Sequence, residues 1–159
     1  NIRGSTRTSG GIVGLNDVFF GPEDTHYGLV KNSYHKGDIE GSDQLGGIAG
    51  SNSGLVNKTY STGIVTSSET SPNYVGGLVG KQGKTAGDLG VLEDSYWNTE
   101  VSQSKSIGNV GDSDAIINGE VSGLTTNEMQ GSAAENNMGT LDFTNKWITV
   151  SGDYPDLRD

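Results

Sequence analysis

Short apolar runs along this chain alternate with glycine, serine, asparagine and threonine. One phrase occurs three times, as GGIVGLN at 10–16, GGIAGSN at 46–52 and GGLVGKQ at 76–82. A second phrase follows each copy, as GLVKNSY at 28–34, GLVNKTY at 54–60 and GVLEDSY at 90–96. Each phrase is a short run of β-forming residues bounded by turn-forming residues, which predicts a strand followed by a turn.

The spacing inside the repeat is regular although the linkers between phrases differ in length. Each second phrase ends in a tyrosine, and an apolar residue stands five positions further on, at Ile39, Val65 and Val101. Three strands in each repeat predict an all-β chain folded as a parallel β-helix, or β-solenoid, of about three coils. Equivalent side chains are then expected to stack, Ile12 on Ile48 on Leu78, Leu29 on Leu55 on Val91, and Ile39 on Val65 on Val101.

Glycine accounts for 26 of the 159 residues, more than twice its usual share of about 7%. A disordered linker would explain this glycine content, but the apolar residues fall in regular clusters that disordered segments lack. Glycine also permits tight corners and leaves room inside a narrow coil. The glycines therefore favour coiling.

These patterns divide the chain into a solenoid at 1–122 and a C-terminal capping segment at 123–159. The solenoid contains units near 10–43, 44–73 and 74–104, followed by an irregular loop at 105–122. Thr125 and Glu128 fit a capping box, which predicts a short helical turn. Large apolar residues gather in the last segment, and we expect it to cover the open end of the solenoid. The N-terminal end shows no comparable cap in the sequence, so we expect either further coils before Asn1 or another subunit stacked there.

Two features indicate possible interfaces. The tyrosine column, Tyr34, Tyr60 and Tyr96, is either a buried stack or an exposed stripe that binds carbohydrate. An insertion at 15–27 lengthens the first unit, and in solenoids such insertions form loops that often lie on the binding face. Phe19 and Phe20 in this insertion either pack on the side of the solenoid or mark an interface.

Net charge is −10, which argues against nucleic acid and anionic membrane surfaces as partners. No apolar run approaches the 18 residues of a membrane helix, so membrane insertion is not expected. The chain lacks cysteine, so no disulfide holds the fold. His26 and His35 belong to no HExxH zinc motif and stand beside no nucleophile elbow.

Three kinds of candidate chemistry remain. Asp112 and Asp114 lie in an acidic loop whose hard oxygen ligands suit Ca²⁺, although the EF-hand pattern is incomplete. Asn57 begins the chain's N-glycosylation sequon, Asn-Lys-Thr. Asp38 and Glu40 represent the carboxylates that a polysaccharide-active β-helix would need, but no acids stand at equivalent positions of the other repeats. No other cofactor is indicated.

The repeated phrases resemble the GLUG-motif repeats of large bacterial and archaeal surface proteins. Four tail segments, SYWNTE (95–100), GLTTNEM (123–129), LDFTNKW (141–147) and DYPDLR (153–158), are similar to the closing segment of those repeat arrays. The resemblance implies a secreted or surface-attached, adhesin-like β-helical protein without catalytic residues in the repeat. The chain departs from the pattern by inserting 110–122, by having Leu141 where a tryptophan is expected, and by ending in Asp159 rather than an aromatic residue.

Residues and resemblance together predict a non-catalytic, extracellular β-solenoid module that builds or decorates a surface assembly through self-association. A fragment of a larger adhesin that binds glycans or proteins is the alternative. A polysaccharide-active enzyme is the third possibility, and a carboxylate cluster on one face of the solenoid would be its sign.

Overall fold

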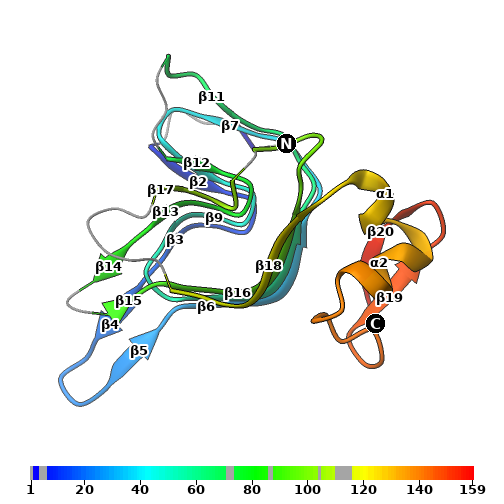
Figure 1. Cartoon of the computed structure of the whole chain (residues 1–159). Coiled ribbons are helices and arrows are strands. Elements are labelled where there is room, and N and C mark those ends of the chain that lie inside the picture. The colour runs from blue at the N-terminus through cyan, green and yellow to red at the C-terminus, as the bar shows by residue number, and fades with distance from the viewer. Residues whose placement is uncertain (1, 4–6, 71–73, 86–87, 104, 110–115) are drawn as a thin grey trace.

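The protein is all-β, with two short helices near the C-terminal end of the part described. The computed structural model describes residues 2–3, 7–70, 74–85, 88–103, 105–109 and 116–159. Its strands run in the same order through successive repeats (Figure 1). Before the first repeat lies β1 (Ile2–Arg3).

The repeats form four units. Unit 1 has β2 (Thr8–Gly10), β3 (Val13–Asn16), β6 (Leu29–His35) and β7 (Ile39–Gly41), with a hairpin of β4 (Val18–Phe20) and β5 (Thr25–Tyr27) inserted. Unit 2 has β8 (Gln44–Gly46), β9 (Ala49–Asn52), β10 (Leu55–Ser61) and β11 (Val65–Ser67). Unit 3 has β12 (Val75–Gly76), β13 (Val79–Gln82) and β16 (Val91–Asn98), with β14 (Lys84–Thr85) and β15 (Asp88–Leu89) inserted. Unit 4 has β17 (Ile107–Asn109) and β18 (Ile116–Leu124).

Equivalent strands of successive units pair in parallel. The four sheets that result have the orders β1-β7-β11, β2-β8-β12, β3-β9-β13-β17 and β6-β10-β16-β18. The register is the one that the repeat predicts, because Leu29 pairs with Leu55 and Leu55 with Val91. The backbone amides of Ile12 and Ile48 likewise donate to the carbonyls of Ile48 and Leu78.

Two expectations about the chain from Val101 to residue 122 were wrong. The segment 105–122 is not an irregular loop in its described part, because β17 pairs with β13 and β18 pairs with β16. Val101 does not stack on Val65, because it lies in a turn and is partly exposed. Gln103 occupies that place instead, and its amide donates to the Val65 carbonyl at 2.8 Å.

Units 1 and 2 each have four repeat strands rather than the three expected, because the GG phrase turns a corner. In unit 2, β8 ends at Gly46 and β9 begins at Ala49, so Leu45, Ile48 and Ala49 are all buried. A Cβ atom on Gly47 would lie 2.2 Å from Ser61 Oγ, and one on Gly77 would lie 2.3 Å from Trp97 Cδ1. The second glycine of the phrase therefore makes room for the side chain that follows the tyrosine.

The long strand of each unit bends at one left-handed residue. Asn32, Lys58 and Asp94 have φ of 46°, 53° and 47° at equivalent positions of β6, β10 and β16. In β18 the bend coincides with a register shift, and Gly119 there has φ of 59°. The bend separates the side chains before it, which pack in the body, from the tyrosines after it.

The core of the body consists of stacked columns rather than one layer. Val30, Val56 and Leu92 form one column with Ile117 at its end, and only Ile117 is exposed. A smaller cluster contains Ile39, Leu45 and Val65. Burial of these side chains is worth about 1.5–3 kcal/mol each, so the interfaces between units supply the stability that one unit cannot provide alone.

The expectation that the C-terminal segment covers the open end of the stack is wrong, because the segment covers one side of it. The segment comprises α1 (Thr126–Met129), α2 (Gly131–Asn137), β19 (Trp147–Val150) and β20 (Asp153–Leu157), and it lies beside the sheet that contains β6, β10 and β16 (Figure 1). The outer strand β18 remains largely exposed. The predicted capping box is confirmed, because the Thr125 and Glu128 side chains each bond the other's backbone amide.

Candidate interaction surface

The tyrosine column is the contact between the repeat body and the C-terminal segment. Tyr34, Tyr60 and Tyr96 pair with one another in successive strands. The rings of Tyr34 and Tyr60 are stacked, with centroids 5.1 Å apart and planes 6° apart. Trp147 packs against both rings, and Tyr60, Tyr96 and Trp147 have no exposed surface.

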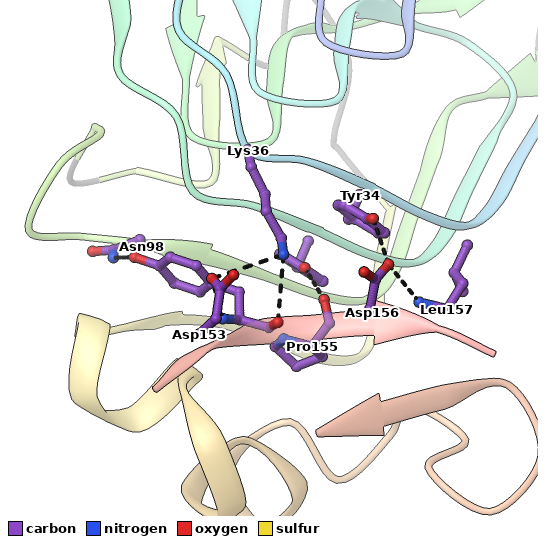
Figure 2. Close-up of polar contacts among 9 residues, drawn as sticks. Tyr34, Lys36, Asn98, Asp153, Pro155, Asp156 and Leu157 are labelled. Carbon is purple, nitrogen blue, oxygen red and sulfur yellow. Dashed lines mark hydrogen bonds and ion pairs between the residues drawn. The ribbon is translucent and has the colours of Figure 1, made fainter. Parts of the chain in front are cut away.

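Polar contacts fix the segment on this column. The Tyr34 hydroxyl donates to Asp156 at 2.5 Å, and the Tyr60 hydroxyl donates to the Pro155 carbonyl (Figure 2). The Tyr96 hydroxyl bonds Thr140 at 2.7 Å. Because β20 reaches both unit 1 and unit 2, the segment clamps successive units along their side.

Lys36 and Asn98 add two further contacts to this interface. The Lys36 ammonium donates to the Tyr154 carbonyl at 3.4 Å and lies 3.8 Å from an Asp153 carboxylate oxygen (Figure 2). The Asn98 amide donates to the Tyr154 hydroxyl at 2.8 Å. Exposed ion pairs contribute little, so the buried rings and their hydroxyl bonds carry most of the interface energy.

Burial shifts the acidity of the column. It raises the pKa of Tyr96 to about 12 and also raises the pKa of Tyr60. The hydrogen bond to Asp156 raises the pKa of Tyr34 and lowers the pKa of the Asp156 carboxyl. The column is thus neutral at physiological pH, as a buried contact requires. Tyr60 and Tyr96 are not an exposed stripe for carbohydrate, because the C-terminal segment covers them.

The hairpin of β4 and β5 presents aromatic side chains instead. Val18 at its base is buried, whereas Phe19 is 67% exposed and Phe20 and Tyr27 are also exposed. Phe19 lies over His26 of the opposite strand, with ring centroids 6.5 Å apart. The hairpin projects from the body (Figure 1). Phe19 and Phe20 therefore do not pack on the side of the body, and the hairpin is the candidate interaction surface of this chain.

Asn57 is a poor glycan acceptor in the folded protein. Its side-chain nitrogen, the atom that would carry the glycan, donates to Glu93 at 2.7 Å, and the residue is 6% exposed. Thr59 of the same sequon is fully buried. The sequence motif identified the tripeptide correctly but could not show that it lies in a strand between two paired strands.

The candidate calcium ligands cannot be located in this structure. Asp112 and Asp114 lie outside the described residues, so calcium binding there stays a prediction. Among the residues that the structure describes, no group of three or more acidic or histidine side chains is placed to hold a metal ion. Burial lowers the pKa of His35, which lies against the unit 1 glycine corner.

A ladder of buried amides is a feature that the sequence reasoning missed. Asn16 donates to Asn52 at 2.8 Å, and Asn52 donates to Gln82 at 3.1 Å, so three successive units are joined by side chains. Asn16 and Asn52 also donate to the carbonyls of Leu55 and Val91, one unit further on. The signal was present, because all three residues end the GG phrase.

Comparison with known proteins gives one partial match. Halomucin of Haloquadratum walsbyi is 35% identical over 114 residues, which cover 67% of this chain and 1% of halomucin. The chain thus spans about one hundredth of the length of that relative. No protein-family model matches the chain, and no solved structure matches it. Within the described residues, no helix is long and apolar enough to cross a membrane.

Proposed function

We propose that this chain is a β-solenoid module of an extracellular surface protein, with a structural or adhesin-like role and no catalysis. The single observation that carries the proposal is the parallel, in-register stacking of equivalent strands from successive repeats. A narrow stack of this kind is stiff because each unit is hydrogen-bonded to its neighbours along several sheets. Stiffness suits a spacer or scaffold better than it suits a substrate-closing enzyme.

The match to halomucin supports the module character of the chain. A stretch that aligns with about 1% of a far longer protein is what a repeat module within a large polypeptide would give. The GLUG-like phrases lead to the same proposal, since that resemblance implies a secreted or surface-attached protein. The acidic net charge agrees with a role that does not involve nucleic acid.

Surface labelling tests the proposed location. Antibodies raised against the purified chain are applied to intact and to permeabilised cells of the source organism. We expect equal labelling of both, because the module is accessible from outside. Labelling that needs permeabilisation would contradict the proposal.

A glycan- or protein-binding adhesin is a second candidate, favoured by the aromatic hairpin. Exposed aromatic rings bind sugars by stacking on their apolar faces. Binding of the chain to a glycan array, abolished in the variant Phe19→Ala, would establish this role. The matched control is Ile148→Ala, which removes an exposed apolar side chain from the C-terminal segment. Turnover of a polysaccharide by the purified chain would instead support the enzyme alternative.

A further inference from the structure

Among the described residues, each end of the stack has the outermost strands of its sheets and an exposed member of a column that is otherwise buried. At the first end, β1, β2, β3 and β6 each pair on one side only among the described strands. We call these four strands the first edge. At the opposite end β17 and β18 are the outermost strands of their sheets, and we call them the last edge. Unpaired parallel edges are templates for a further strand.

Apolar side chains are exposed at both edges for one physical reason, the lack of a covering unit among the described residues. At the first edge Ile12 is 41% exposed, although Ile48 and Leu78 behind it are fully buried. Leu29 at the start of β6 is 59% exposed. At the last edge Ile117 is 50% exposed, whereas Leu92 in the same column is fully buried.

Charge differs between the two edges. The four strands of the first edge contain basic residues, Lys31 among them, and no acidic residue. The two strands of the last edge contain one acidic residue, Glu120, and no basic residue. First edges would repel one another and last edges would repel one another, whereas a first edge attracts a last edge.

We propose that the last edge of one copy of this chain docks on the first edge of a second copy, with β18 parallel to β6. The inference rests on the β-solenoid proposed above and names its partner. The contacts inside the chain show what this interface would contain, because Leu55 on Leu29 and Ile116 on Val91 are the same kind of pair. Such a contact joins two different surfaces and leaves a free edge at each end, so copies add in an open row.

Sedimentation analysis of the purified full chain over a range of concentrations tests the proposal. We expect masses that rise with concentration beyond the dimer, because the contact does not close. Ile12→Lys blocks the first edge and Ile117→Lys blocks the last edge, and each is expected to weaken association at least about tenfold. Ile148→Lys, which changes a similarly exposed isoleucine away from both edges, is the matched control and is expected to associate like the unaltered chain.

Mixing the two blocked variants gives the sharpest result. Each variant keeps one intact edge, so together they are expected to form a one-to-one dimer that grows no further. Circular dichroism and melting of each variant alone verify that it is folded. A chain that stays monomeric at the highest concentration overturns the proposal. So does an Ile117→Lys variant that still dimerises, since it would indicate a two-fold contact. Neither result affects the surface location, which cell labelling measures separately.

Discussion

One left-handed residue sets the shape of each long strand. The equivalent positions are occupied by Asn32, Lys58, Asp94 and Gly119, all with positive φ. Asparagine, aspartate and glycine tolerate this conformation, because a short polar side chain or no side chain relieves the clash with the backbone. Lys58 has neither advantage, so its left-handed backbone conformation is locally unfavourable and must be held by the strands that pair with β10 on both sides.

Substitution of Lys58 tests this account of the bend. Lys58→Asn and Lys58→Val remove the same charge but differ in their tolerance of positive φ. We expect the asparagine variant to be more stable than the valine variant by about 1–2 kcal/mol, because a β-branched residue fits the left-handed region worst. Urea unfolding of both variants measures the difference. Equal stabilities would mean that the bend is not set by this residue.

The position of the C-terminal segment on the repeat body depends on the buried ring of Trp147. Trp147 has no exposed surface and touches Tyr34 and Tyr60, whereas its neighbour Ile148 is 41% exposed. Deleting a buried aromatic side chain removes its burial and leaves a cavity. The segment therefore depends on Trp147 for its attachment to the body.

Trp147→Ala is expected to destabilise the protein by about 3–5 kcal/mol. Ile148→Ala, in the same strand, is expected to lower the free energy of unfolding by well under half of that amount, because the Ile148 side chain buries less surface than Trp147. Denaturant unfolding followed by circular dichroism measures both changes. Similar losses for the two variants would show that Trp147 is not the anchor.

The same interface predicts a loss of stability in alkali. Tyr34, Tyr60 and Tyr96 all have pKa values raised above 10 in the folded protein. A raised folded pKa gives stability that is complete below the unfolded pKa near 10 and is lost as pH rises above it. We expect the free energy of unfolding to fall above pH 10, and to fall less steeply in Tyr60→Phe, which cannot ionise there. An unchanged pH slope in that variant would contradict the assignment.

The sequence predicted some of the strands and their pairing correctly, but not the fourth unit or the position of the C-terminal segment. The spacing of the phrases predicted the register of the three tyrosines, because a repeat with fixed offsets must stack like on like. The spacing did not reveal unit 4. The register shifts at the bend near Gly119, and Ser122 takes the position of the tyrosine, so the second repeated phrase cannot be recognised there. The sequence also misplaced the C-terminal segment, because composition shows that apolar side chains need cover but not which surface they cover.

At the scale of the whole molecule, charge opposes folding. The net charge of −10 places like charges together in the compact state, and salt screens them, shortening the Debye length from about 30 Å at 0.01 M to about 10 Å at 0.1 M. We expect the melting temperature to rise by a few degrees over this range, which corresponds to about 1 kcal/mol. Sodium chloride and choline chloride are expected to raise the melting temperature equally, because screening depends on ionic strength. A melting temperature that falls with salt would show that attractive pairs dominate.

In-register stacking of the units is the claim on which the other proposals depend. Glu40 and Thr66 are exposed partners in β7 and β11, one unit apart, and parallel partners lie about 4.8 Å apart. That spacing falls within the reach of a disulfide, and the chain has no cysteine of its own. The pair Glu40→Cys with Thr66→Cys is compared with Glu40→Cys with Ser68→Cys, which is out of register by two residues.

The most direct measurement is the rate of disulfide formation in these two double variants under mild oxidation. We predict rapid, intramolecular closure for the 40 and 66 pair and much slower closure for the 40 and 68 pair. Equal rates, or faster closure of the out-of-register pair, would contradict the stacked arrangement.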